Sequence, residues 1–192
     1  ILARLHQKAK RDNLQYVQTL KYAKFDTKEE IEITLTSNFT DNKATGGISS
    51  ISDGGAVCFE SNGTVSNCNF ADNTADYGGA VCFESNGEVT NCNFTGNTVT
   101  GDGGAIWIYS GTVTNCNFTN SSATGAGGAV YFYDNSEVTN CNFIYNVAKS
   151  STLGGGAIFF MISGNVAKCN FTDNSASFGG AVWMFSGTVI NS

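Results

Sequence analysis

Five cysteines recur in one short motif, and a thiol in a fixed setting could serve several kinds of chemistry. The motif reads TVSNCNF at 64–70, and its copies place Cys68, Cys92, Cys116, Cys141 and Cys169 two residues before a phenylalanine. Such a cysteine could bind a metal, form a disulfide, act as a nucleophile or fill a small apolar space. No histidine accompanies the motif and no Cys-x-x-Cys spacing occurs, so the sequence predicts no metal site.

Acidic side chains offer the second candidate chemistry. Glu60 and Glu84 occupy equivalent positions in successive copies, and stacked coils would bring them about 5 Å apart, the separation of a retaining glycosidase pair. The interpretation we favour is that they are two surface acids, repeated because their coils are near-copies. Residues 44–192 contain no arginine and no histidine, and their two lysines lie in different copies. A lyase base and a His-based triad are therefore lacking, and we predict no catalytic residues, no metal and no cofactor.

A repeat determines the elements that must position these residues. The motif Gly-Gly-Ala-Val/Ile recurs at spacings of 24, 25, 24, 28 and 24, with its alanine at Ala56, Ala80, Ala105, Ala129, Ala157 and Ala181. A fixed period in this range indicates a solenoid, and segments rich in Val, Phe, Cys and Thr between Gly and Asn indicate strands and turns. We predict an all-β fold, a single-stranded parallel β-helix of about 24 residues per coil.

Two regions follow from this reading. Residues 31–192 are predicted to form the β-helix, and residues 1–30 a short helical segment that caps its first coil. The last repeat is incomplete at Ser192, so we expect further repeats after it.

Alternation along the strands predicts the columns that face the core. After each repeated alanine comes Val or Ile, and two residues further a large apolar residue, so both columns should point inward. The Val and Phe of the cysteine motif should also point inward, but they are five residues apart, so alternation breaks between them. Asparagine tolerates left-handed backbone, and we assign the break to a bend at Asn67, Asn91, Asn115 and Asn140.

Beyond this bend the five cysteines should face the core as a buried ladder. We predict reduced thiols, because cysteine is among the most buried small residues and five cysteines in one column cannot all pair. Disulfides between adjacent coils stay the alternative, since Cα atoms about 4.8 Å apart can be bridged. The next corner is assigned to Asn73, Asn97, Asn146 and Asn174, with Ser121 in one copy.

The outward positions of the first strand carry most of the bulky residues outside the predicted core. One outward column reads Cys58, Cys82, Trp107, Tyr131, Phe159, Trp183, and the next reads Glu60, Glu84, Tyr109, Tyr133, Met161, Phe185. An exposed aromatic face of this size is typical of an interface with a sugar or a protein. The predicted ligand or partner surface therefore consists of Trp107, Tyr109, Tyr131, Tyr133, Phe159, Trp183 and Phe185.

Charge is distributed unevenly along the chain. Residues 1–43 hold eight Lys/Arg and six Asp/Glu, whereas residues 44–192 hold two lysines and ten acids. Such an acidic surface cannot neutralise phosphates, so we predict no nucleic-acid partner. No apolar run is long enough to span a bilayer, so we predict no membrane span in this sequence.

The pairing of Gly-Gly-Ala-Val/Ile with Phe-x-x-Asn, as in Phe70–Asn73 and Phe143–Asn146, resembles the repeats of the polymorphic outer membrane proteins. It is similar also to adhesin-like surface proteins of methanogenic archaea. The resemblance covers about residues 37–192, although Phe118 lacks its asparagine. It implies a right-handed β-helix on a cell surface.

We therefore expect a non-catalytic, extracellular, adhesin-like module at the cell surface. The expected partner is a protein or glycan of a host or neighbouring cell, with self-association as a further possibility. The alternative is the β-helix domain of a carbohydrate-active enzyme, either a polysaccharide lyase or a glycoside hydrolase.

Overall fold

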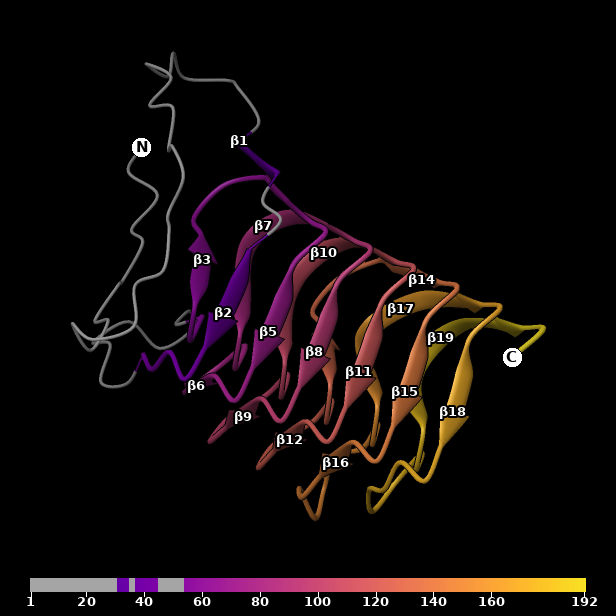
Figure 1. The fold of residues 1–192 in the computed structure, drawn as a ribbon. Coiled ribbons are helices and arrows are strands. Elements are labelled where there is room, and N and C mark those ends of the chain that lie inside the picture. Colours follow the sequence, from indigo (N-terminus) through magenta and orange to yellow (C-terminus); the bar gives the residue numbers. More distant parts are fainter. Residues whose placement is uncertain (1–30, 35–36, 45–53) are drawn as a thin grey trace.

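The computed structural model describes residues 31–34, 37–44 and 54–192, which form a stack of about six coils (Figure 1). Every strand pairing is parallel and joins equivalent positions of successive copies, as in Val57↔Val81 and Phe70↔Phe94. The predicted parallel β-helix of about 24 residues per coil is confirmed. The described residues contain no helix, and hence none that could cross a membrane. The predicted helical cap at 1–30 lies outside the described residues.

Three parallel sheets run along the stack, and each complete coil contributes to them in turn. The largest has nine strands: β1 (Ile31–Thr34), β3 (Val57–Phe59), β4 (Gly63–Ser66), β7 (Val81–Thr90), β10 (Ile106–Thr114), β13 (Val130–Phe132), β14 (Ser136–Thr139), β17 (Ile158–Ala167) and β19 (Val182–Ile190). The second has six: β2 (Asn38–Thr40), β5 (Asn69–Ala71), β8 (Asn93–Thr95), β11 (Asn117–Thr119), β15 (Asn142–Ile144) and β18 (Asn170–Thr172). The third has four: β6 (Thr74–Ala75), β9 (Thr98–Val99), β12 (Ser122–Ala123) and β16 (Val147–Ala148).

The core is a set of stacked columns that run the length of the helix. The inward Val, Ile and Phe columns predicted from alternation are buried in one continuous cluster. One column consists of phenylalanines whose ring centroids lie 4.8–5.2 Å apart in parallel stacks, from Phe39 through Phe70, Phe94, Phe118 and Phe143 to Phe171. Each fully buried ring stabilises the fold by about 1.5–3 kcal/mol, so the column ties successive coils together.

Left-handed backbone makes both corners of the second sheet. The predicted bend is confirmed, because Asn67, Asn91, Asn115 and Asn140 have φ of 54–56°. The second corner lies one residue earlier than predicted: the left-handed residues are Asp41, Asp72, Gly96, Asn120, Tyr145 and Asp173. The asparagines that follow them point inward, and this burial explains why the sequence places asparagine there.

The Gly-Gly-Ala motif allows neighbouring coils to approach closely. Its first glycine has positive φ in the five copies from Gly78 onward, for example 72° at Gly103 and 64° at Gly127, and this conformation costs glycine little. A Cβ on the second glycine, Gly104, would lie 2.0 Å from the carbonyl oxygen of Gly128 in the next coil. The motif therefore marks the place where backbone packs directly on backbone.

Candidate functional site

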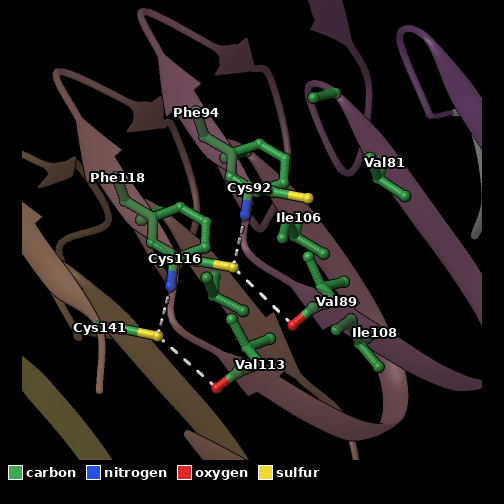
Figure 2. Close-up of a cluster of buried hydrophobic side chains, with 14 of the residues drawn as sticks. Val81, Val89, Cys92, Phe94, Ile106, Ile108, Val113, Cys116, Phe118 and Cys141 are labelled. Atoms are coloured by element: carbon green, nitrogen blue, oxygen red, sulfur yellow. Dashed lines mark hydrogen bonds between the residues drawn. The ribbon is translucent and has the colours of Figure 1, made fainter. Parts of the chain in front are cut away.

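The cysteine column lies inside the core, as predicted. Cys68, Cys92, Cys116, Cys141 and Cys169 are at most 2% exposed, and the structure contains no disulfide among the described residues. The backbone N–H of each cysteine donates to the sulfur of the next coil's cysteine: the distance from Cys92 N to Cys116 Sγ is 3.4 Å, and from Cys116 N to Cys141 Sγ also 3.4 Å (Figure 2). The sulfur thus accepts a buried N–H that the bend removes from the sheet ladder.

The last described coil indicates that the side chain of the cysteine column serves as a hydrogen-bond acceptor rather than as a nucleophile. In the last described coil Ser192 replaces the cysteine, and its Oγ accepts from Cys169 N at 3.1 Å. Each thiol also lies near a main-chain oxygen, with Cys116 Sγ 3.1 Å from Thr114 O. Hydrogen bonds with the Cys141 and Cys92 thiols, together with burial, raise the pKa of Cys116 above its ordinary value, whereas hydrogen bonds with neighbouring thiols lower the pKa of Cys92 and Cys141. What all five thiols share is burial, which keeps a substrate from reaching them, so the column is not placed to supply a nucleophile. The reduced state stays a prediction.

The first outward column is not the exposed stripe that alternation predicted. Its residues point away from the main core but form a second buried cluster, in which Trp107 is 5% exposed, Tyr131 7% and Phe159 0%. The rings stack along the axis: Trp107 on Tyr131 at 6.0 Å, Tyr131 on Phe159 at 5.1 Å and Phe159 on Trp183 at 4.6 Å. The exposure predicted for Trp107, Tyr131 and Phe159 is therefore wrong, and Trp183 is half-buried.

The turns that lead into the Gly-Gly-Ala motifs cover this column. Tyr77 and Ala126 lie in such turns and pack against the buried rings. One turn is fixed to its neighbour by Asp102, whose Oδ1 accepts from Ala126 N at 2.7 Å. Burial raises the pKa of Asp102 above its usual value, and burial also raises the pKa of Tyr131. Alternation reveals the face of a strand but not the segment that folds over that face.

The second outward column remains as the candidate binding surface. Tyr109 is 41% exposed, Tyr133 42%, Met161 40% and Phe185 75%. These four residues, here termed the exposed apolar column, come from successive coils of the first sheet. The rings of Tyr109 and Tyr133 stack at 5.2 Å with 20° between their planes, and Phe185 meets Trp183 edge to face at 5.2 Å. The stack fixes the relative position of the two tyrosine rings before any partner binds.

The acidic end of the same column carries Glu60 and Glu84. Both are exposed and follow Phe59 and Phe83, which pair in register, so the two acids occupy adjacent coils as predicted. Within the described parts of the chain, no group of three or more His, Cys, Asp or Glu side chains could hold a metal ion.

Two ladders of hydrogen-bonded asparagines were not predicted from the sequence. The outer one uses the second asparagine of each NCNF motif: Nδ2 of Asn93 donates to Asn69 Oδ1 at 2.8 Å, and Asn117 to Asn93 at 2.8 Å. The inner one uses the buried asparagines after the second corner, where Asn73 N and Nδ2 both donate to Asn97 Oδ1 at 3.0 Å. The recurrence of asparagine, strict at the outer position and broken only by Ser121 at the inner one among the described copies, was the signal for these ladders.

A family model described as a right-handed β-helix region matches residues 24–153, more than half of the chain. The chain belongs to the right-handed β-helix family. The handedness that the resemblance implied is thereby confirmed. No curated protein and no solved structure is significantly similar to the chain.

Proposed function

We propose that this chain is a non-catalytic binding module of a cell-surface adhesin and that the exposed apolar column is its contact surface. One observation carries the proposal: four large apolar side chains, each at least 40% exposed, form a row over successive coils of one sheet. Single exposed apolar residues are ordinary, but a contiguous row is typical of an interface. Stacked strands hold the row rigid, so little side-chain entropy is lost on binding.

The stacking geometry favours a protein partner over a glycan. A sugar ring binds an aromatic residue by lying on its open face. Tyr109 and Tyr133 stack face to face, so each ring covers one face of its neighbour. The pair therefore presents ring edges and hydroxyl groups to a partner. Edges and hydroxyls suit the mixed apolar and hydrogen-bonding surface of a protein, where tyrosine is a frequent anchor.

The placement on a cell surface rests on the resemblance of the repeats to polymorphic outer membrane proteins and methanogen adhesin-like proteins. The proposed location is extracellular, and the proposed partner is a protein of a host or neighbouring cell. The acidic surface suits this reading, because it disfavours contact with nucleic acid and with anionic lipid.

The test compares the labelled 192-residue chain with Tyr133→Ser and Tyr133→Phe on a panel of cells. We expect binding by the wild type and by Tyr133→Phe, which keeps the stacked ring, and at least about a tenfold loss with Tyr133→Ser. Protease treatment of the cells should abolish binding, whereas glycosidase treatment should not. Equal binding by all three chains would contradict the proposed surface.

A polysaccharide panel tests the non-catalytic part of the proposal. Release of reducing ends or unsaturated uronates by the wild type, lost in Glu84→Gln, would show that the chain is instead a carbohydrate-active enzyme. We expect no release by either chain.

A further inference from the structure

One corner of the solenoid departs from the pattern of every other coil. The turn from β15 to β16 lies at this corner (Figure 1). Its outward residues are Ile144, Tyr145 and Val147. The column of Ile144 otherwise holds Thr40, Ala71, Thr95, Thr119 and Thr172. The column of Val147 otherwise holds Lys43, Thr74, Thr98, Ser122 and Ser175. Among the described coils, only this one presents three large apolar side chains at the corner.

Tyr145 is both exposed and conformationally strained. It is 53% exposed, and its φ of 58° lies in the left-handed region, which is unfavourable for a bulky residue. The other coils place Asp41, Asp72, Gly96, Asn120 and Asp173 at this point, all residue types that adopt this conformation readily. The tyrosine ring adds little to the core, so the burial of this ring within the chain does little to offset the strain.

Charge on the same corner indicates what covers it. Lys149 lies four residues beyond Tyr145, and among the described residues the only other cations are Lys43 and Lys168. The β3–β6 coil has acids in the same columns: Asp72 at the position of Tyr145, and Asp76 beside Thr100 in the column of Lys149. Asp173 follows Tyr145 in the same column, and Asp41 and Lys43 lie one coil before Asp72 and Thr74. The end of the corner with Tyr145 therefore carries one lysine and one acid beside its apolar residues. The other end, here termed the acidic end, carries three acids and one lysine.

We propose that this corner is a self-complementary interface that binds a second copy of the chain. A two-fold axis perpendicular to the solenoid reverses the order of the coils, so it sets the β13–β16 coil of one copy against the β3–β6 coil of the other. Tyr145 and Lys149 of each copy then face the acidic end of the other copy, and the same contact forms twice. The surface is distinct from the exposed apolar column, which belongs to another sheet.

The experiment is sedimentation velocity of the 192-residue chain over a dilution series of about two orders of magnitude. We expect a reversible dimer whose dissociation constant rises at least about tenfold in Tyr145→Asn and several-fold in Lys149→Glu. Raising the salt concentration should weaken the wild-type dimer, because exposed charge pairs are screened. Tyr133→Ser, which changes the exposed apolar column, should dimerise like the wild type.

Tyr145→Asn is a fold-preserving variant, since Asn120 occupies the equivalent position in the preceding coil at a φ of 55°. A wild type that stays monomeric throughout the dilution series would overturn the proposal. This holds even if a different protein were found to bind the corner, because the proposed partner is a second copy of the chain. A dimer that is unaffected by Tyr145→Asn would overturn it equally, because the contact would then lie elsewhere.

Discussion

Replacing Ser121 by asparagine should stabilise the fold, because Ser121 interrupts the buried asparagine ladder. Ser121 is fully buried, and its Oγ has no hydrogen-bond partner among the described residues. Its neighbours in the column are Asn97 and Asn146. Asn146 Oδ1 accepts a hydrogen bond from Ser121 N at 3.0 Å. On the other side, Ser121 has no amide oxygen that could accept a hydrogen bond from Asn97.

The gain can be estimated from Asn73, which occupies the equivalent position two coils earlier. Its Oδ1 accepts from Asn42 N at 3.0 Å and Asn42 Nδ2 at 2.9 Å, and its Nδ2 donates to Phe39 O and Asn97 Oδ1, both at 3.0 Å. An asparagine at 121 would make the same set of bonds, each worth about 0.5–1.5 kcal/mol net. Ordering the longer side chain costs about 1–2 kcal/mol. We expect a net stabilisation of about 1–3 kcal/mol.

The assay is urea unfolding of Ser121→Asn beside two controls, with calorimetry as a second measurement. A gain of this size raises the midpoint temperature by about 2–4 °C per kcal/mol. Ser122→Asn, at the outward neighbour, should change stability by less than about 0.5 kcal/mol. Ser121→Ala, which removes the unpartnered hydroxyl, should be neutral or slightly stabilising. If Ser121→Asn unfolds at lower denaturant than the wild type, the ladder does not account for the buried asparagines.

Three further predictions concern other parts of the coil. Cys92→Ala should destabilise the fold by about 1–3 kcal/mol because Cys68 N loses its acceptor, and Cys92→Ser should cost less; equal losses in urea unfolding would refute the acceptor role. Gly104→Ala should cost more than about 3 kcal/mol or prevent folding, since its Cβ meets backbone of the next coil; a folded protein by circular dichroism with wild-type stability would contradict this. Burial raises the pKa of Asp102 in the folded state, so the folded chain binds more protons and stability falls as pH rises above about 4 through the raised pKa. Asp102→Asn, which keeps an acceptor for Ala126 N, should remove that fall in unfolding measured from pH 4 to 7, and an unchanged pH profile would count against it.

Much of the fold was predictable because a solenoid repeats its solution in every coil. The period, the inward columns and the bend at Asn67 and its copies all followed from residue types at fixed spacing. Each copy repeats the same local constraint, so one ambiguous residue hardly affects the reading. The corner after Phe70 was placed one residue late, because asparagine suits both left-handed backbone and a buried hydrogen-bonding role.

The sequence by itself determined the stacking: a Gly-Gly-Ala and NCNF period near 24 allows only strands placed in register on their own copies. It could not determine what covers the outside of the stack. Trp107 and Tyr109 both alternate outward, yet turns that carry Tyr77 and Ala126 bury the first and leave the second exposed. Local alternation is set by the backbone of one strand, whereas burial depends on segments that arrive from neighbouring coils, and only the tertiary structure brings these together.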